Sequence, residues 1–220
     1  MHARELMQSG VAGRIFKIYS ALEDSNPAPN GYVSGGILPD MSVHNVDEIL
    51  WLTGEMPERA LAFGSRLYSH RLTTSGEDFD DAMLLLWFAG ERMAQVQVTR
   101  NHVSGYRVET VMYGEQGQIR IGRFEQRPLE VLVEAYGRRG TPEPITRRTF
   151  HMRQYGDSGL PEFVDRFGDA YKNEVRVFLE CCHSGAAFPT SHRDGLRAQQ
   201  VISAGMRAVI GKAQAASVEG

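Results

Sequence analysis

Three ionisable residues near position 40 stand at helical spacing. At about 100° per residue, Asp40, His44 and Asp47 fall within an arc of roughly 60° on one side of a helix. Imidazole titrates near neutral pH, so His44 is suited to take a proton from a hydroxyl group, and a carboxylate one turn away can fix its tautomer. The pattern therefore suits a general base, His44, with Asp40 as its orienting partner.

Two other interpretations of these residues stay open. Pro39 and an acidic residue are favoured in the first turn of any helix, so Asp40 can be a simple helix-start residue and His44 an ordinary half-buried histidine. The three side chains can also be metal ligands, although the rest of the chain offers no further ligands at the usual spacing. Cys181, Cys182 and His183 do not supply them, because consecutive helical positions diverge. We therefore predict no metal site.

Five segments in order along the chain carry a shared pattern. Gly35 and Gly36 precede the three ionisable residues as GG-x3-D-x3-H-x2-D, and four further segments accompany them, at 5–15 (ELMQSGVAGRI), 104–117 (SGYRVETVMYGEQG), 166–174 (RFGDAYKNE) and 188–198 (FPTSHRDGLRA). Together they resemble the C-terminal half of the glucose-fructose oxidoreductase and inositol 2-dehydrogenase family (Gfo/Idh/MocA). One segment alone is a weak signal, but five in family order are specific.

The resemblance implies roles for individual residues. In such enzymes hydride leaves a substrate carbon for a nicotinamide, and by resemblance His44 takes the hydroxyl proton while Asp40 orients and polarises it. Gly35 and Gly36 would let the backbone approach nicotinamide and substrate closely. Polar groups that can hydrogen-bond a polyol, with turn chemistry as the alternative, are Asp24, Asn101 and Tyr106.

The chain also departs from the family pattern. Family members begin with a Rossmann domain that carries G-x-G-x-x-G and an E-K-P segment with a catalytic lysine. Neither is found here, since the three lysines, Lys17, Lys172 and Lys212, all lie outside such a context. We therefore expect one substrate-binding and oligomerisation domain at 1–220, with the Rossmann domain supplied in cis or in trans.

These observations favour the C-terminal substrate-binding and catalytic half of an NAD- or NADP-dependent dehydrogenase. Its substrate class would be a sugar, a cyclitol such as inositol, or a cyclic dihydrodiol. The alternative is a non-enzymatic sugar-binding or dimerisation module that kept the fold. The Asp40 and His44 pair favours an enzyme. Substrate identity, stereochemistry and the choice between NAD and NADP stay open, because the residue that reads the ribose lies in the other half.

Hydrophobic periodicity predicts an α+β fold with a large, mostly antiparallel sheet and helices packed on one face. Short turns between neighbouring strands indicate an antiparallel meander. The expected helices cover 2–9, 40–53, 161–184 and 194–213, and the expected strands cover 14–20, 60–69, 81–88, 92–100, 106–113, 118–124, 129–135 and 145–152.

Composition and patterning also bear on partners. The net charge of −3 argues against a nucleic-acid or anionic-membrane partner, and no apolar run approaches the ~18 residues that span a bilayer. Two cysteines in one helical stretch fit a reducing, cytoplasmic location. The outer face of the sheet would carry Val111, Tyr113 and Leu132, which are too apolar for open water. We therefore expect a homo-oligomer, a dimer or a tetramer, formed through the sheet.

The isolated chain should bind neither NAD nor NADP tightly. Dinucleotide affinity comes largely from a glycine-rich turn, a helix N-terminus facing the pyrophosphate and a ribose-binding side chain, all of which belong to the Rossmann half. Isothermal titration with each dinucleotide tests this expectation. Micromolar binding would reveal a nucleotide site that the sequence does not predict.

Overall fold

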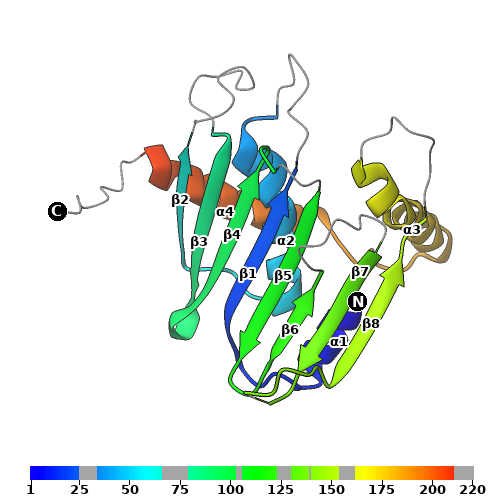
Figure 1. Ribbon diagram of the computed structural model, residues 1–220. Coiled ribbons are helices and arrows are strands. Elements are labelled where there is room, and N and C mark those ends of the chain that lie inside the picture. The colour runs from blue at the N-terminus through cyan, green and yellow to red at the C-terminus, as the bar shows by residue number, and fades with distance from the viewer. Residues whose placement is uncertain are drawn as a thin grey trace.

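The computed structural model describes residues 1–24, 34–65, 79–102, 106–122, 130–138, 140–153 and 162–210. Within these ranges the chain forms one eight-stranded sheet and a set of helices (Figure 1). The helical elements are α1 (His2–Gln8), η1 (Leu38–Ser42), α2 (Val43–Thr53), η2 (Ala89–Glu91), α3 (Glu162–Ser184) and α4 (His192–Ile210). The strands are β1 (Ile15–Glu23), β2 (Arg59–Ser65), β3 (Asp81–Phe88), β4 (Arg92–Thr99), β5 (Arg107–Gly114), β6 (Gln118–Ile121), β7 (Glu130–Tyr136) and β8 (Thr146–His151).

The strand order is β2-β3-β4-β1-β5-β6-β7-β8, and every neighbouring pair is antiparallel except β1 with β4. The prediction of a mostly antiparallel sheet is confirmed. The prediction of a simple meander is wrong at one place, because β1 lies between β4 and β5. Because β1 is a central strand, both edges of its nine residues are hydrogen-bonded to neighbouring strands. Ala21 and Leu22 of β1 are buried in the middle of the sheet.

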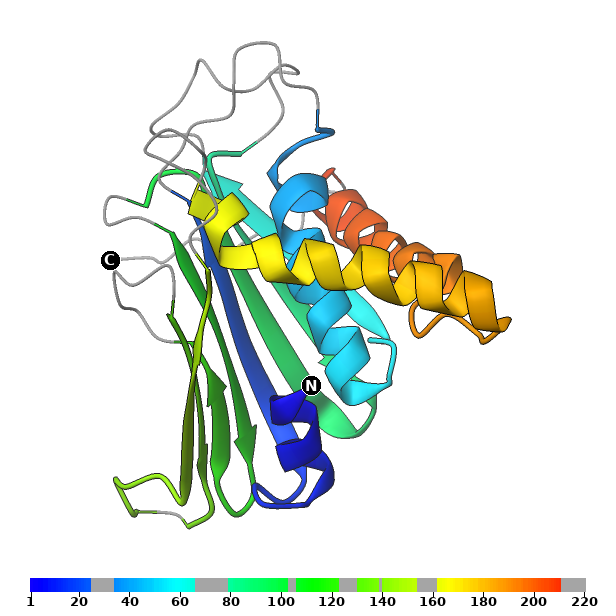
Figure 2. The ribbon, with the colours of Figure 1, turned by 90° about the vertical axis from the view of Figure 1, so that its right-hand side faces the viewer.

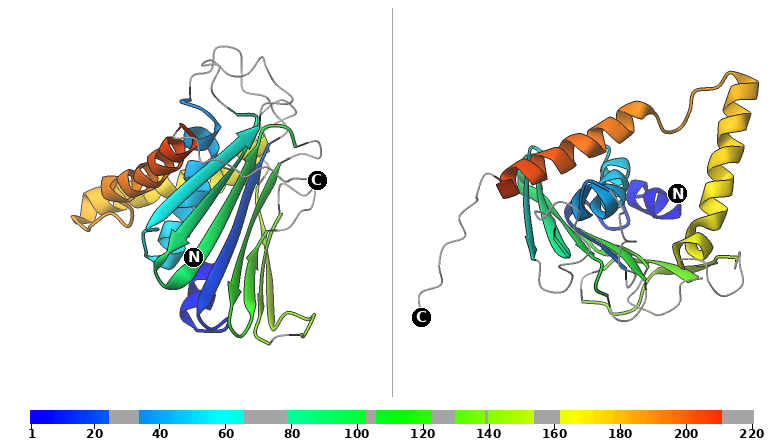
Figure 3. Two further views of the ribbon diagram at one scale, coloured as in Figure 1. Left: turned by 90° about the vertical axis from the view of Figure 1, so that its left-hand side faces the viewer. Right: turned by 90° about the horizontal axis from the view of Figure 1, so that it is seen from above.

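The helices lie on one face of the sheet, as the sequence predicted. Figures 2 and 3 show α1, α2 and α4 against this inner face, whereas α3 runs away from the sheet before α4 returns to the β2 edge. Alternate residues of the central strands point inward, which follows from the two-residue period of a strand. Ile18, Leu84, Val96 and Met112 are fully or almost fully buried beneath the helices. Their burial against α2 and α4 forms the core.

The outer face of the sheet is partly apolar and partly ionic. Val111 is buried, while Tyr113 and Leu132 are half-buried on this face. Acidic and basic side chains alternate across β1, β5, β6, β7 and β8. The ion pairs join Glu23 to Arg107 (3.2 Å), Arg107 to Glu109 (2.8 Å), Arg120 to Glu109 (3.7 Å) and Arg147 to Glu134 (2.7 Å).

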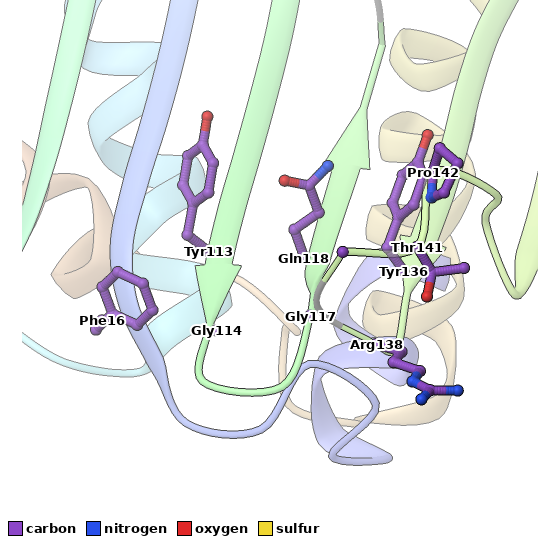
Figure 4. Close-up of a pocket in the computed structure, with 10 residues that line it drawn as sticks. Phe16, Tyr113, Gly114, Gly117, Gln118, Tyr136, Arg138, Thr141 and Pro142 are labelled. Atoms are coloured by element: carbon purple, nitrogen blue, oxygen red, sulfur yellow. The ribbon is translucent and has the colours of Figure 1, made fainter.

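A pocket of about 490 Å³ opens on the outer face near the β5–β6 turn (Figure 4). Phe16, Tyr113 and Tyr136 supply its rings, and Gln118 and Arg138 supply polar groups. The sheet separates this pocket from α2, so it is not the place where the predicted site residues gather. In the described part of the chain, no helix is long and apolar enough to cross a membrane.

Close backbone packing at the β5–β6 turn provides a stability test. A Cβ added at Gly114 would lie 2.0 Å from the Ala12 carbonyl oxygen, whereas one at Gly195, exposed in α4, would meet nothing within 4 Å. We expect Gly114→Ala to lower the free energy of unfolding by about 1–3 kcal/mol. Gly195→Ala should raise it by up to about 1 kcal/mol, because alanine favours a helix. Urea denaturation followed by circular dichroism measures both, and equal effects would contradict the packing argument.

Candidate active site

Two glycines turn the chain into the helix that carries the predicted catalytic residues. Gly35 has φ of 79° and Gly36 has φ of 110°, backbone conformations that residues with a Cβ rarely adopt. The Asp40 N–H then donates to the Gly36 carbonyl (3.0 Å), and the helix continues to Gly54, which ends it with φ of 72°. The glycines therefore have a local conformational role. Their predicted approach to nicotinamide and substrate stays a prediction.

The first turn of this helix differs from the expected α-helix starting at Asp40. Residues Leu38–Ser42 form the wider π-type turn η1, and α2 begins at Val43. In a π-turn the hydrogen bond closes five residues along, so the angle between Asp40 and His44 about the helix axis differs from the one expected for a regular α-helix. That the two side chains share one side of the helix stays a prediction.

A chain of buried hydrogen bonds fixes α2 on the sheet. The Asn45 Nδ2 donates to Ser20 Oγ (2.7 Å), and Ser20 Oγ lies 2.8 Å from Thr110 Oγ1. Thr110 Oγ1 in turn donates to Glu48 Oε2 (2.6 Å). Ser20 is on β1 and Thr110 is its partner on β5, so two turns of α2 are held by two central strands. Asn45 and Glu48 therefore face the sheet.

His44 directly precedes Asn45 and is exposed on α2. Asp47, three residues later, is half-buried, and the pKa of its carboxyl is raised by burial and by the charge of Asp194, while the charge of His44 lowers it. The electrostatic coupling of His44 and Asp47 follows from their neighbouring positions on the helix surface. His44 is therefore exposed on the helix surface with a carboxylate three residues away.

Asp40 has a partner that the sequence did not predict. The Arg100 guanidinium, just beyond β4, donates through Nη2 to Asp40 Oδ2, and both side chains are largely buried. The Arg100 N–H donates to the Asp80 carbonyl (3.2 Å), which holds the arginine at the end of the sheet. The sequence offered one indication of this partner, because Arg100 is a basic residue directly before the proposed substrate contact Asn101. The pair fixes the Asp40 carboxylate at the helix N-terminus.

The three predicted substrate contacts lie at the same end of the sheet. The His102 N–H donates to the Asp24 carbonyl (3.0 Å), which joins the ends of β1 and β4. Asn101 Nδ2 donates to Asp81 Oδ2 (3.2 Å), so this amide is engaged in the loop, as the turn-chemistry alternative expects. Tyr106 precedes β5 and meets Phe167 of α3 edge-on, with ring centroids 6.3 Å apart. Their contact with a polyol stays a prediction.

Acidic side chains in the described part of the chain bear on the metal interpretation and on the start of α4. Among the described residues, which include Asp40, His44 and Asp47, no group of three His, Cys, Asp or Glu side chains is placed to hold a metal ion. The Ser191 and Asp194 pair caps α4, since Asp194 Oδ2 accepts from Ser191 N–H (2.8 Å) and Oγ (2.9 Å). The helix accordingly begins at His192, two residues before the predicted start.

Comparison with known proteins identifies the family. Residues 1–120 match the model of the GFO/IDH/MocA C-terminal domain, so the chain belongs to this family. The chain is 27% identical over 216 residues to inositol 2-dehydrogenase of Rhizobium meliloti, which covers 97% of this chain and 60% of the relative. It is 28% identical over 194 residues to myo-inositol 2-dehydrogenase of Thermotoga maritima, which covers 87% of this chain and 53% of the relative. The chain thus spans little more than half of each relative.

Solved structures agree on the fold. Myo-inositol 2-dehydrogenase from Lactobacillus plantarum superimposes with a TM-score of 0.73 at 24% identity, over 96% of this chain and 59% of the other. Scyllo-inositol dehydrogenase from Lactobacillus casei, with bound NAD(H) and scyllo-inositol, gives a TM-score of 0.71 at 24% identity, over 94% of this chain and 58% of the other. The fold and the family predicted from five short segments are confirmed.

Glu48 allows a test of how α2 is held. Burial raises the pKa of its carboxyl, although the hydrogen bond from Thr110 lowers it. Because the pKa of Glu48 is higher in the folded than in the unfolded state, protonated Glu48 stabilises the fold at low pH. This contribution is lost as the pH rises from the pKa of the unfolded state through the pKa of the folded state. We therefore expect Glu48→Gln, which can still accept from Thr110, to flatten the decline of unfolding free energy above pH 4.5.

The measurement is urea denaturation between pH 4 and pH 8. Glu174→Gln is the matched control, because Glu174 is exposed on α3 and its removal should leave the pH dependence unchanged. If Glu48→Gln leaves the pH dependence of the unfolding free energy unchanged, the Glu48 carboxyl does not have the raised pKa that we infer from its burial.

Proposed function

We propose that this chain is the C-terminal substrate-binding and catalytic half of an NAD- or NADP-dependent dehydrogenase that oxidises a hydroxyl of an inositol-like cyclitol or a sugar. The observation that carries the proposal is the exposed His44 on a helix that begins with Gly35, Gly36 and the Arg100-bound Asp40. The family assignment and the names of the relatives, which are inositol dehydrogenases, support the same substrate class.

In the proposed mechanism His44 accepts the hydroxyl proton of the substrate at an imidazole nitrogen. Its exposure on α2 leaves room for a polyol, and the Asp47 carboxylate lies three residues later on the same helix. Asp40 accepts a hydrogen bond from the substrate or from His44, while Arg100 prevents its carboxylate from turning away. A bound NAD or NADP would supply a nicotinamide able to accept hydride from the hydroxyl carbon.

The residues of this chain fit only the nicotinamide end of such a cofactor. Positive φ values at Gly35 and Gly36 expose their backbone beside α2, but the sequence holds no G-x-G-x-x-G for the pyrophosphate. None of the three lysines stands in an E-K-P segment, and Lys17 lies over the Tyr113 ring on the outer face (4.7 Å). The rest of the cofactor site would come from a Rossmann domain, in cis or in trans.

We also propose that copies associate through the outer face of the sheet. Phe63, Met83 and Met93 are exposed there on β2, β3 and β4, and Phe16 is exposed on β1. Large exposed apolar side chains on one sheet face favour contact with another subunit. A cytoplasmic location stays a prediction from the reduced cysteines.

Light scattering tests the association. We expect a mass at least twice the 24.6 kDa of one chain at micromolar concentration. Met83→Glu should shift the species toward monomer because it places a charge in the contact, whereas Leu196→Glu, exposed on α4, should not. A monomeric parent chain would contradict the proposal, and an oligomer that resists Met83→Glu would place the contact elsewhere.

The general-base role is tested in a complete enzyme, made by fusing a compatible Rossmann half. We expect His44→Ala to lower turnover by about 100-fold or more, because general base catalysis contributes about this much. Asp40→Asn should cost less and shift the pH profile. His151→Ala, on β8, is the control and should leave turnover unchanged.

Steady-state kinetics with myo- and scyllo-inositol between pH 6 and pH 9 supply the measurement. If His44→Ala keeps full turnover over this range, the histidine is only a surface residue of the helix. If a folded fusion oxidises no cyclitol or sugar, the alternative of a non-enzymatic binding module gains support.

A further inference from the structure

The outer part of α3 presents an apolar stripe to solvent. Tyr171 is 49% exposed, Val175 59%, Phe178 53% and Leu179 60%. At about 100° per residue these four side chains fall within an arc of roughly 100° over two turns of helix. Large apolar residues grouped on one side of an exposed helix mark a contact surface.

The stripe continues a contact that the domain itself makes. Phe167 lies about 40° from Tyr171 on the helix surface, and its ring meets the edge of Tyr106. The first turns of α3 thus use this side of the helix to pack beside the candidate site. Farther along, the same side carries equally large apolar groups without equivalent burial.

The opposite side of α3 is polar and internally paired. Arg176 donates to Glu180 (2.5 Å) and to Asn173 (2.7 Å). Beyond the helix, Phe188 stacks on Phe178 with centroids 5.3 Å apart and 12° between the rings. The outer helix is therefore an ordered amphipathic element whose polar side suits water and whose apolar side does not.

The position of α3 relates this stripe to the candidate site. Figure 2 shows α3 crossing the sheet side that holds α2, and Figure 3 shows α1 and α2 lying between the sheet, α4 and α3. Met1 lies on this same side of the sheet. In the Rhizobium meliloti relative, two fifths of the protein fall outside the part matched by this chain. The family model that begins at residue 1 describes a C-terminal domain, so in the relatives another domain precedes it.

We propose that the stripe of Tyr171, Val175, Phe178 and Leu179 is the docking face for the dinucleotide-binding domain. The inference rests on the proposed function and names the surface through which this half holds its partner. A domain seated on α3 lies on the His44 side of the sheet, where a nicotinamide is needed. A second copy has the outer sheet face available, which lies on the other side of the molecule.

The test uses a fusion of the N-terminal segment of the Rhizobium meliloti relative to Met1 of this chain. Hydrogen–deuterium exchange of residues 171–182 is compared between the chain alone and the fusion. We expect exchange to slow at least tenfold in the fusion, because docking suppresses local opening of the helix. The exchange readout does not depend on enzymatic activity.

Paired variants separate the two sides of α3. Tyr171→Asp with Val175→Asp places two charges on the stripe, and Asn173→Asp with Arg176→Asp places two on the opposite side of the same turns. The stripe variant should lose the protection and lower inositol turnover at least tenfold, while the control keeps both. All four positions are exposed, so the melting temperature of the isolated chain should change little in either variant.

The possible outcomes separate this inference from the proposed function. Protection of α3 in a fusion that oxidises no polyol supports the docking face and contradicts the function. Unchanged exchange of α3 in the fusion, whether active or inactive, contradicts the docking face. An isolated chain whose self-association disappears in the stripe variant would make the stripe a contact between copies, which also contradicts the inference.

Discussion

The buried hydrogen-bond chain from Asn45 through Ser20 and Thr110 to Glu48 is the interaction on which the site depends. Each such bond contributes only about 1 kcal/mol to stability, but a buried donor or acceptor left without its partner costs more. These hydrogen bonds therefore fix the rotation of α2 about its own axis and its position along the sheet. In this arrangement His44 is exposed.

Charged side chains lie on both faces of the sheet, but they are arranged differently on each. On the inner side, Arg100 holds Asp40 at the start of the helix, and Asp47 couples electrostatically to His44. On the outer side, arginines shield carboxylates such as Glu134, which is fully buried although no described helix covers that face. The inner charges lie around the candidate site residues, and the outer charges pair with one another. The proposed chemistry therefore belongs to the helical side.

The molecule leaves two apolar surfaces exposed, and they have different characters. The outer sheet face is broad and mixes Phe63 and Met83 with ion pairs, which suits association between copies. The stripe on α3 is narrow, lies on an extended element and continues a contact beside Tyr106. The proposed function uses both surfaces, the outer sheet face for a second copy and the stripe for the domain that carries the cofactor.

The sequence by itself determined the family, the antiparallel sheet with helices on one face, and the extent of most elements. These follow from local periodicity and from short motifs such as Gly35-Gly36. It did not predict the insertion of β1 between β4 and β5, because strand order depends on long-range pairing. It also missed the Arg100 partner of Asp40. That ion pair joins Asp40, within the π-type turn η1, to a residue 60 positions farther along the chain, and only the tertiary structure brings them together.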